Sequence, residues 1–558
     1  MKKVFLPAFA CIILLTGCNG LHSDREKGET VESVPFVWDN ASIYFLLTDR
    51  FCNADPANDV HFNRTAETAL LRGFEGGDFQ GITKKIREGY FDSLGVNVLW
   101  FSPVVEQIHG LVDEGTGPTY GFHGYWARDW TSLEPNFGTE KELRELVSTA
   151  HRHGIRILMD VVLNHTGPVT ERDPLWPGDW VRTGPPCRYD SFGSTVSCTL
   201  VENLPDIRTE RNEETELPPF LLEKWEREGR LERELAELDA FFKETGYPRA
   251  PKYYLIKWII DLIRDYGVDG FRVDTAKHVE ESVWAELRKQ AERAFSQWKK
   301  ENPGEIPEGQ DFYLLGEVYN YGISSTFYYD FGDRQVNYFA HGFSSLINFE
   351  FKHDATRDYE GMFSKYSGLL NGELEEYGVV NYVSSHDDGY PYDRYREKPL
   401  EAGTRLLLCP GTAQIYYGDE TARSLDIPGA EGDASLRSFM NWEALEAGGG
   451  EGKPTAREVL EHWRKLGRFR AEHPAVGAGV HRMISEDPYL FIRTWQDEGH
   501  ADTVLVGLDL DPGRHILNVE GIFENGSRLQ EYYSDREVMV NNGRVSLDTA
   551  SGIILLGS

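Results

Sequence analysis

The stretch from Tyr253 to Tyr319 limits the possible folds more than any other part of the chain. It begins with isoleucines at helical spacing and glycines that end the helix. The apolar segment GFRVDTA follows, then a second helical segment and the apolar segment FYLLGEV. Strands joined by a helix run parallel, so Asp274 and Glu317 are expected near the carboxyl ends of neighbouring parallel strands. Structural ion pairs at the strand ends are the alternative interpretation.

The same alternation of strand and helix patterns continues on both sides of this stretch. In total, eight apolar segments with strand character are separated by helical segments. This alternation predicts an α/β fold, a (β/α)8 TIM barrel, whose functional side chains gather at the carboxyl-terminal rim of the strands. The eight predicted strands cover residues 42–50, 96–105, 155–164, 270–276, 312–318, 345–351, 379–388 and 412–420.

Two regions depart from the barrel pattern, and the length of 558 residues exceeds what one compact core holds. Residues 166–250 contain a loop rich in proline, glycine and tryptophan, then an acidic run at 221–245 that predicts a solvated surface helix. We interpret residues 166–250 as a subdomain B inserted after the third strand. Residues 476–558 show alternating strand patterns, which predicts a C-terminal all-β domain, a β-sandwich. The barrel would then consist of residues 38–165 and 251–475.

The N-terminus has the pattern of an export signal. Two lysines precede an apolar run that is too short to span a membrane and that ends in the residues LTGC at Cys18. This resembles a bacterial lipoprotein signal, with residues 1–17 removed, lipid attached to Cys18 and residues 18–37 forming a tether. An ordinary secretory signal is the alternative. Both interpretations predict export, and the lipid would anchor the protein to a membrane, facing the periplasm or the cell surface.

Charge and cysteine spacing limit the partners and the compartment. Aspartate and glutamate number 91 against 58 lysines and arginines, which gives a net charge of −33. This balance argues against nucleic acid as a partner, because nucleic-acid binding needs a basic surface. It suits a neutral partner. Cys187 and Cys198 flank a short polar segment, so we expect a local disulfide between them in an exported chain.

Residues with chemical function follow several of the predicted strands. In their order and spacing these blocks resemble the α-amylase superfamily, glycoside hydrolase family thirteen, and the likeness extends from about residue 40 to the C-terminus. The segment LPDI at residues 204–207 resembles a further motif of that family. The blocks contain Tyr125 and Trp126, then Asn164 and His165, then Arg272, Asp274, Lys277 and His278, then Glu317, and finally His386 and Asp387.

The resemblance implies an endo-acting, retaining α-1,4-glucan hydrolase that cleaves starch or maltodextrins. Asp274 would be the nucleophile that forms a glycosyl-enzyme, and Glu317 the acid that protonates the leaving oxygen and later activates water. Two carboxylates about 5 Å apart suit such a retaining reaction. Nearby carboxylates raise one another's pKa, so one of them can stay protonated. Asp387 would be a third acid that binds sugar hydroxyls and stabilises the cationic transition state.

The resemblance also implies a set of substrate-binding residues. Arg272 would keep the nucleophile ionised, Tyr125 would stack on the sugar at the cleavage point, and Lys277 with His278 would bind the sugar on the leaving side. For the histidines a structural role is the alternative, and most aromatic side chains of a barrel belong to its core. The expected substrate-binding residues are Tyr125, Trp126, His165, Arg272, Lys277, His278 and His386.

One or two calcium ions are expected as cofactors from the same resemblance, because hard oxygen ligands from distant segments suit Ca²⁺. The first site would use Asn164, Asp206 and the backbone carbonyl of His278, and would connect the insertion to the barrel. An ordinary turn rich in aspartate and asparagine is the alternative for the second site. The ligands of the second site would be Asn53, Asp55, Asn58, Asp59, Gly76 and Asp78.

Two other functions are compatible with parts of this pattern. A transglycosylating relative, cyclodextrin-forming or a 4-α-glucanotransferase, would use the same acids and would differ in its products. A non-catalytic glucan-binding lipoprotein would lack at least one of the three acids, and all three are present. The expected partner is therefore an α-1,4-glucan, bound by a monomer.

Overall fold

The computed structural model describes residues 34–307, 309–447, 453–497 and 499–558. The expected signal at residues 1–17, Cys18 and most of the tether at 18–37 lie outside the described residues. Residues Phe36–Ser558 form one compact unit. Within the described part of the chain, no helix is both long enough and apolar enough to cross a membrane.

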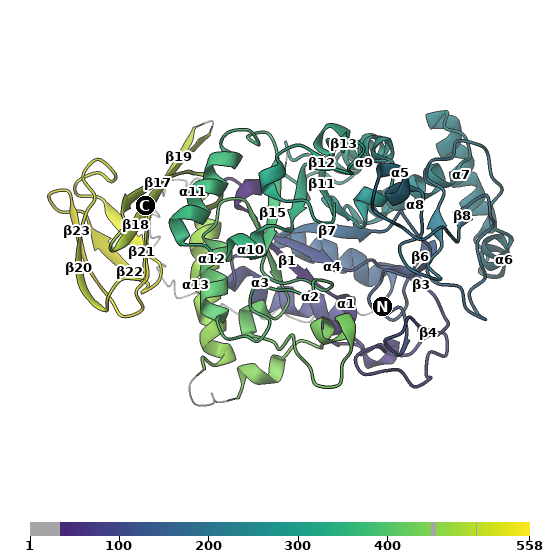
Figure 1. The fold of residues 1–558 in the computed structure, drawn as a ribbon, viewed down its shortest axis with the longest axis horizontal. Coiled ribbons are helices and arrows are strands. Elements are labelled where there is room, and N and C mark those ends of the chain that lie inside the picture. Colours follow the sequence, from purple (N-terminus) through teal and green to yellow (C-terminus); the bar gives the residue numbers. More distant parts are fainter. Residues whose placement is uncertain (1–33, 308, 448–452, 498) are drawn as a thin grey trace, which may run out of the picture. The chain divides into compact units, whose positions relative to one another are not determined.

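The centre of this unit is a closed barrel of eight parallel strands (Figure 1), as predicted. Each predicted strand is present, but each ends earlier than predicted because the chain turns into the rim loops. Around the barrel the strands follow one another in chain order. They are β1 (Ser42–Leu46), β2 (Val98–Phe101), β7 (Arg156–Val161), β10 (Gly270–Val273), β11 (Tyr313–Gly316), β14 (Ser345–Asn348), β15 (Gly378–Tyr382) and β16 (Thr412–Tyr416).

The register of three neighbouring strands sets the level of the rim. Arg272 on β10 lies opposite Asp160 on β7 and Leu315 on β11. The ladder continues one residue beyond the strands, because the backbone N–H of Asp274 donates to Val161 and that of Glu317 donates to Val273, each at 3.0 Å. Both acids therefore leave the barrel at the same height.

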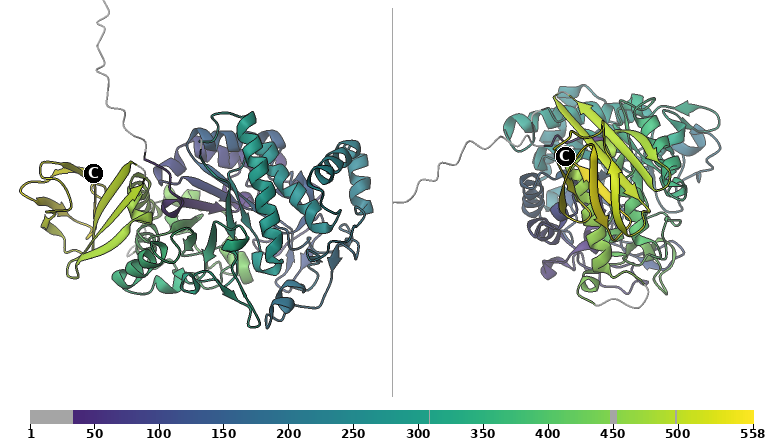
Figure 2. Two further views of the ribbon diagram at one scale, coloured as in Figure 1. Left: turned by 90° about the horizontal axis from the view of Figure 1, so that it is seen from above. Right: turned by 90° about the vertical axis from the view of Figure 1, so that its left-hand side faces the viewer.

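Helices surround the barrel in a layer that buries its outer face (Figure 2). The predicted helix before β10 is α8 (Pro251–Tyr266), which starts with proline and ends at Gly267 in the left-handed region, with φ 72°. Most of its side chains are buried, which fits its continuous apolar pattern. The other long helices of the layer are α2 (Phe79–Arg87), α4 (Glu140–Arg152), α9 (Glu281–Glu301), α11 (Tyr359–Leu370), α12 (Pro399–Leu407) and α13 (Ala456–Glu472).

Short elements complete the barrel and its rim. One-turn helices lie next to the strands, and two-stranded hairpins project from the loops. The one-turn helices are α1 (Thr48–Phe51), α3 (Tyr90–Ser93), α10 (Phe351–Asp354) and α14 (Ala475–Ala478). The hairpin strands are β3 (Val105–Gln107) with β6 (Ala127–Leu133), β4 (Val112–Asp113) with β5 (Pro118–Thr119), and β12 (Tyr329–Asp330) with β13 (Gln335–Val336).

The inserted segment after β7 differs from the prediction in one respect. The run at 221–245 is not one solvated helix but two, α6 (Pro219–Arg227) and α7 (Leu231–Thr245), because Gly229 takes a left-handed φ of 71° between them. Both helices bury apolar side chains. The amine of Lys224 joins α6 to β6, since it lies 2.6 Å from the carboxylate of Asp129. The rest of the insertion holds β8 (Val181–Arg182), α5 (Phe192–Val196) and β9 (Asp206–Ile207).

The C-terminal region is an antiparallel β domain with its own apolar cluster, as predicted. Figure 2 shows its sheet face-on in the right-hand view. Its six-stranded sheet has the order β17 (Val480–Ser485), β18 (Tyr489–Asp497), β19 (His500–Leu508), β24 (Ile554–Gly557), β21 (Arg528–Glu531) and β22 (Arg536–Met539). A separate pair consists of β20 (Gly513–Asn518) and β23 (Arg544–Thr549).

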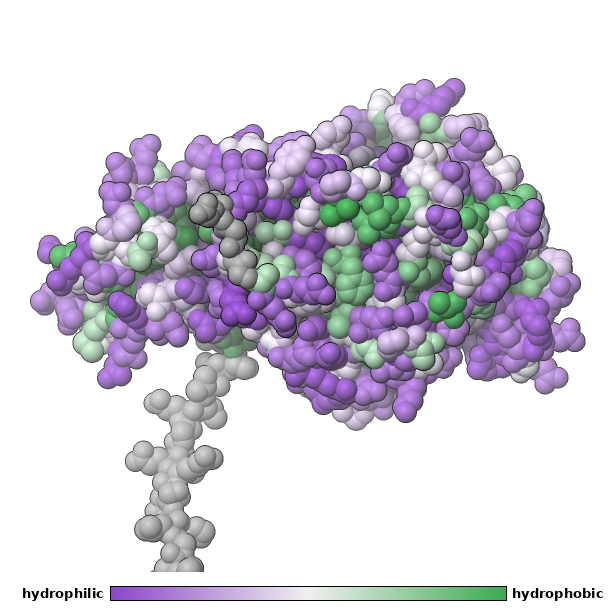
Figure 3. Space-filling model, turned by 90° about the horizontal axis from the view of Figure 1, so that it is seen from below, coloured by the Kyte–Doolittle hydropathy of each residue, from purple (hydrophilic) through white to green (hydrophobic). Residues whose placement is uncertain are grey.

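The surface of the molecule is mainly polar. Figure 3 shows a face on which hydrophilic residues dominate and apolar residues form separate small groups.

Candidate active site

Four charged side chains form the centre of the site. The guanidinium of Arg272 is 1% exposed and lies 2.8 Å from the carboxylate of Asp274 and 3.1 Å from that of Glu317. The third carboxylate in contact with it belongs to Asp160, at 3.0 Å. One buried guanidinium therefore holds the predicted nucleophile and the predicted acid next to each other.

Asp160 is a residue that sequence reasoning missed. It is 2% exposed, and besides Arg272 it accepts hydrogen bonds from the Tyr125 hydroxyl at 2.9 Å and from the Trp100 indole at 3.0 Å. An acid inside the apolar strand segment ILMDVV was the available signal. Its role follows only from the strand register, which places it opposite Arg272.

Glu317 is arranged to hold a proton. Burial raises the pKa of Glu317 well above its usual range; Arg272 opposes this effect, and the negative charges of Asp274 and Asp387 add to it. Its Oε2 also accepts a hydrogen bond from the backbone N–H of Thr275 at 2.8 Å. A carboxyl group with a raised pKa is suited to general acid catalysis near neutral pH.

The pKa of Asp387 is shifted in the opposite direction to that of Glu317, although both side chains belong to the same charged cluster. Burial works against its ionisation, but His386, a hydrogen bond from the Ser385 hydroxyl at 2.7 Å, and Arg272 together lower the pKa of Asp387. Its side chain is 34% exposed, so it can reach a ligand in the cavity. The site thus contains one carboxyl that favours protonation and another that favours ionisation.

The predicted sugar-binding residues Tyr125, His165 and His386 are brought together. The Tyr125 ring stacks on the His386 ring with 5.1 Å between centroids, and His165 Nε2 lies 3.1 Å from the Tyr125 carbonyl oxygen. Burial lowers the pKa of His386 to about 4 and also lowers the pKa of His165. Both rings are therefore neutral near pH 7.

A cavity of about 600 Å³ opens beside Glu317 and Asp387. The predicted leaving-side residues Lys277 and His278 line it, and so do three tyrosines that sequence reasoning missed, Tyr189, Tyr319 and Tyr329. The Lys277 amine lies 5.1–5.5 Å from the centroids of the three rings. Burial lowers the pKa of Lys277 to about 8, although Glu317 acts in the opposite direction.

Of the predicted substrate-binding residues, only Lys277 and His278 line this cavity, and Trp126 lies in a different environment. It is 5% exposed and packs in a small apolar cluster with Ile108, Val112 and Leu204. Its backbone N–H is bound by the Gln107 side chain at 2.6 Å. The packing fits a structural role for Trp126, because its ring is covered by other side chains.

Two of the residues expected to bind the first calcium ion, Asn164 and Asp206, lie close together. Asn164 and Asp206 are 1% and 2% exposed, and the backbone N–H of Ile207 donates to the Asn164 carbonyl at 2.7 Å. Within the described part of the chain, the buried Asn164 Oδ1 has no hydrogen-bond donor. Asp206 Oδ2 is paired with Arg182, whose Nε lies 2.8 Å away. A buried oxygen without a donor fits a hard cation.

The second expected site is a cluster of short polar side chains between α1 and α2. Asn53 Oδ1 and both side-chain polar atoms of Asn58 are buried and have no hydrogen-bond partner in residues 34–307, 309–447, 453–497 and 499–558. Asn53 Nδ2 donates to Asp59 at 2.8 Å. A Cβ at Gly76 would lie 2.5 Å from the Asp59 carboxylate, so only glycine fits there. Asp78 caps α2 and accepts backbone hydrogen bonds, as an ordinary turn residue does. Asp55 also accepts locally, from Ala57.

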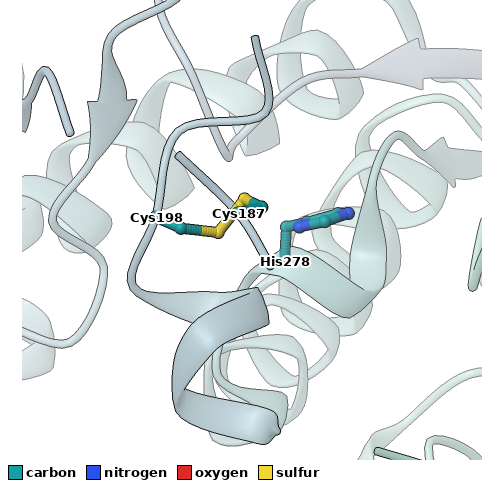
Figure 4. Close-up of side chains that lie close together, drawn as sticks. All are labelled: Cys187, Cys198 and His278. Carbon is teal, nitrogen blue, oxygen red and sulfur yellow. A yellow bond between two sulfur atoms is a disulfide. The ribbon is translucent and has the colours of Figure 1, made fainter. Parts of the chain in front are cut away.

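Cys187 and Cys198 form the predicted disulfide, and His278 lies against it (Figure 4). Their ligand atoms lie within 4.8 Å of one another, the spacing of a metal site. Metal binding by cysteine requires a free thiolate, however, and both sulfurs are used in the disulfide. The three residues are therefore a structural contact.

Comparison with known proteins agrees with this geometry. A family model described as "Alpha amylase, catalytic domain" matches residues 45–173. The periplasmic alpha-amylase of Escherichia coli (strain K12) is 36% identical over 531 residues, covering 85% of this chain and 73% of the relative. A cyclomaltodextrin glucanotransferase of Thermoanaerobacterium thermosulfurigenes is 25% identical over 522 residues, covering 88% of this chain and 63% of the relative.

Solved structures with low sequence identity show the same fold. An Anoxybacillus alpha-amylase has a TM-score of 0.64 at 22% identity, covering 94% of this chain and 98% of the other. An alpha-amylase from Geobacillus thermoleovorans, complexed with acarbose, has a TM-score of 0.63 at 20% identity, covering 94% and 99%.

The charge arrangement predicts how activity responds to pH. Glu317 must be protonated to act as an acid, so activity falls as pH rises through its pKa. Asp387→Asn removes a negative charge that raises this pKa. In the residual activity of Asp387→Asn, the alkaline limb of the pH profile of kcat/KM should therefore move to lower pH. Asp388→Asn is the control, because Asp388 is paired with Lys352 and the limb should stay in place. An unmoved limb in Asp387→Asn would contradict the assignment.

Proposed function

Because the chain belongs to the alpha-amylase family and is an alpha-amylase-type glycoside hydrolase, we propose that it is endo-acting and retaining, and cleaves α-1,4 bonds in starch or maltodextrins. The observation that carries the proposal is the contact of Arg272 with both Asp274 and Glu317. A single guanidinium that holds two carboxyl groups brings them close together, as a retaining reaction requires. The opposite shifts in the pKa of Glu317 and Asp387 support separate roles for them.

In the proposed mechanism, Asp274 attacks the anomeric carbon while Glu317 gives its proton to the leaving glycosidic oxygen. The bond from carbon to that oxygen breaks, and a glycosyl ester of Asp274 forms. Glu317, now a carboxylate, takes a proton from water, which attacks the same carbon and releases Asp274. Asp387 stabilises the positive charge of the transition state, because its lowered pKa keeps it ionised.

The proposed substrate contacts divide between the two sides of the cleaved bond. The neutral rings of His165 and His386, together with Tyr125, bind the sugar that is attacked. Lys277, His278 and the tyrosine-lined cavity bind the sugar that leaves. Transfer to a second glucan in this cavity, as in the glucanotransferase relative, uses the same acids, so product analysis separates hydrolysis from transfer.

Calcium has a structural place in this proposal. Asn164, Asp206 and the His278 carbonyl would hold one ion between insertion and barrel, and the cluster of Asn53, Asp55, Asn58, Asp59, Gly76 and Asp78 would hold another. The support is the buried Asn164 Oδ1 in the first place and the buried Asn53 and Asn58 oxygens in the second, none of which has a hydrogen-bond donor among the described residues. A bound cation compensates such oxygens and links segments that are distant in sequence.

We propose that the protein is exported and that lipid attached to Cys18 anchors it. The support is the LTGC pattern at the end of the N-terminal apolar run and the relative described as periplasmic. Glucan is the proposed partner, and solved relatives are described in complex with acarbose and with maltose.

The acids give the first prediction of this proposal. Asp274→Asn and Glu317→Gln should each lose about 10²–10⁴-fold or more in kcat on starch, since loss of one acid–base group has that cost. Circular dichroism should show normal folding. The wild-type enzyme should release products in the α-anomeric form, measured by proton NMR. A variant that keeps more than about a tenth of the wild-type rate, or β-anomeric products, would refute the roles of Asp274 and Glu317.

The calcium sites give a second prediction. Exhaustive chelation should lower the melting temperature, and added Ca²⁺ should restore it by mass action. Asp206→Ala should remove the part of the change in melting temperature that depends on the first calcium site. Asn58→Ala should remove the part that depends on the second site. The double variant should no longer respond to the chelator. An unchanged melt after chelation, with no calcium by elemental analysis, would exclude both ions.

The anchor gives a third prediction. The mature protein should begin at an acylated Cys18 and fractionate with membranes, because several acyl chains on one cysteine bind stably. A form that starts at Val34 should be soluble and fully active, and Cys18→Ser should be released or remain unprocessed. Mass spectrometry of the N-terminus measures this directly. An unmodified N-terminus at another residue would indicate an ordinary secretory signal.

A further inference from the structure

The disulfide loop, residues 187–198, packs directly against the leaving side of the site. Cys198 Sγ lies 3.1 Å from the carbonyl oxygen of Thr195, and the same oxygen lies 2.9 Å from Nδ1 of His278. Figure 4 shows the disulfide and the His278 ring next to each other. The helix α5 within this loop also contacts the turn that carries Lys277 and His278. Only one carbonyl group therefore separates the disulfide from a side chain that lines the cavity.

The contact with Thr195 determines how His278 can bind a ligand. A carbonyl oxygen only accepts hydrogen bonds, so Nδ1 of His278 must carry hydrogen. In the neutral ring the other nitrogen, Nε2, is then an acceptor. An acceptor on the wall of the cavity suits the hydroxyl group of a sugar. If the Thr195 carbonyl moved away, the His278 ring could change both its orientation and its tautomer.

The loop also presents Tyr189 to the cavity in a strained conformation. Tyr189 has φ 59°, in the left-handed region that is unfavourable for a residue other than glycine. Its side chain is 53% exposed, yet its ring lies 5.8 Å from the His278 ring and 5.4 Å from the Lys277 amine. A strained and exposed tyrosine persists only where the surrounding chain holds it, and Cys187 lies two residues away.

A second set of contacts joins the loop to the hairpin β12–β13. The backbone N–H of Phe192 donates to Asp333 at 2.7 Å, and the Phe192 ring packs on Phe331 with 5.2 Å between centroids. The guanidinium of Arg334 also lies over the Phe192 ring, 4.0 Å from its centroid. The same hairpin carries Tyr329, which lines the cavity. The loop therefore bridges two walls of the leaving side.

We propose that the Cys187–Cys198 disulfide is a positioning device for the leaving-side glucan: by closing the loop it holds Tyr189 and the Thr195 contact of His278 in place. The inference rests on the proposed glucan hydrolysis. The disulfide acts through these residues and does not touch substrate. It determines how well the enzyme uses glucose units beyond the cleaved bond, and how well it holds a glucan that accepts the glycosyl group in transfer.

Two substrates separate this role from a general role in stability. Maltoheptaose places glucose units in the leaving-side cavity, whereas 2-chloro-4-nitrophenyl maltotrioside has an aryl leaving group. In the double variant Cys187→Ser/Cys198→Ser, kcat/KM for maltoheptaose should fall about tenfold, the cost of one or two lost hydrogen bonds and a stacking contact. For the aryl glycoside it should fall less than about twofold, because the attacked sugar and the acids are unaffected. Transfer of the glycosyl group to added maltose should decrease together with kcat/KM for maltoheptaose.

Matched controls lie in the same loop. Ser197→Ala, outside these contacts, should leave both substrates unchanged. Tyr189→Ala should reproduce part of the selective loss, and Tyr189→Phe, which keeps the ring, should not. If the double variant does not fold, the folded wild-type enzyme can be reduced with tris(2-carboxyethyl)phosphine in the presence of calcium. Two electrons and two protons then convert the disulfide to two thiols, which alkylation and mass spectrometry assign to Cys187 and Cys198.

The outcomes are distinct. A selective loss on maltoheptaose, in the double variant or after reduction, supports the positioning role. An equal loss on both substrates, or a lower melting temperature with both kcat/KM values unchanged, would overturn it and leave the disulfide with a role in stability alone. A wild-type enzyme that cleaves neither substrate would instead refute the proposed function.

Discussion

The structure of the active site depends on one buried cation. Arg272 contacts carboxylates from three adjacent barrel strands, Asp160 from β7, Asp274 after β10 and Glu317 after β11. The planar guanidinium can bind several acceptors in fixed directions, as an ammonium group cannot. Loss of such a buried partner leaves uncompensated charges, which typically costs about 3–5 kcal/mol. The same contact therefore joins the strands, orders the acids and sets their electrostatics.

Around this rigid centre, the leaving side is assembled from parts of the chain that are far apart in sequence. The turn after β10 supplies Lys277 and His278, the insertion supplies Tyr189, and the β12–β13 hairpin supplies Tyr329. Strands hold the acids because the barrel register leaves them little freedom. In the proposed function loops bind the leaving sugar, and loops need further contacts to hold them in place. The disulfide is one such contact, and the proposed ion between Asn164 and Asp206 is another.

The sequence was sufficient to predict the barrel and the placement of its acids, because buried parallel strands are short apolar runs between helices and glycines. It did not reveal Asp160, since an acid within an apolar strand acquires its partner only through the register with β10. Tyr189 and Tyr329 were missed because exposed and core tyrosines look alike in a sequence. Trp126 lies in a small apolar cluster, and its contact with substrate stays a prediction.

The central claim is that Asp274 forms a covalent bond to the sugar while Arg272 holds it beside Glu317. Trapping this intermediate is the most direct test. The Glu317→Gln variant would be incubated with maltosyl fluoride, whose fluoride leaves without acid assistance, and its peptides analysed by mass spectrometry. We expect the peptide that contains Asp274 to gain the mass of one maltosyl unit, attached to that carboxylate. A label on Asp387 or Asp160, or fluoride release with no adduct and a β-anomeric product, would contradict the account.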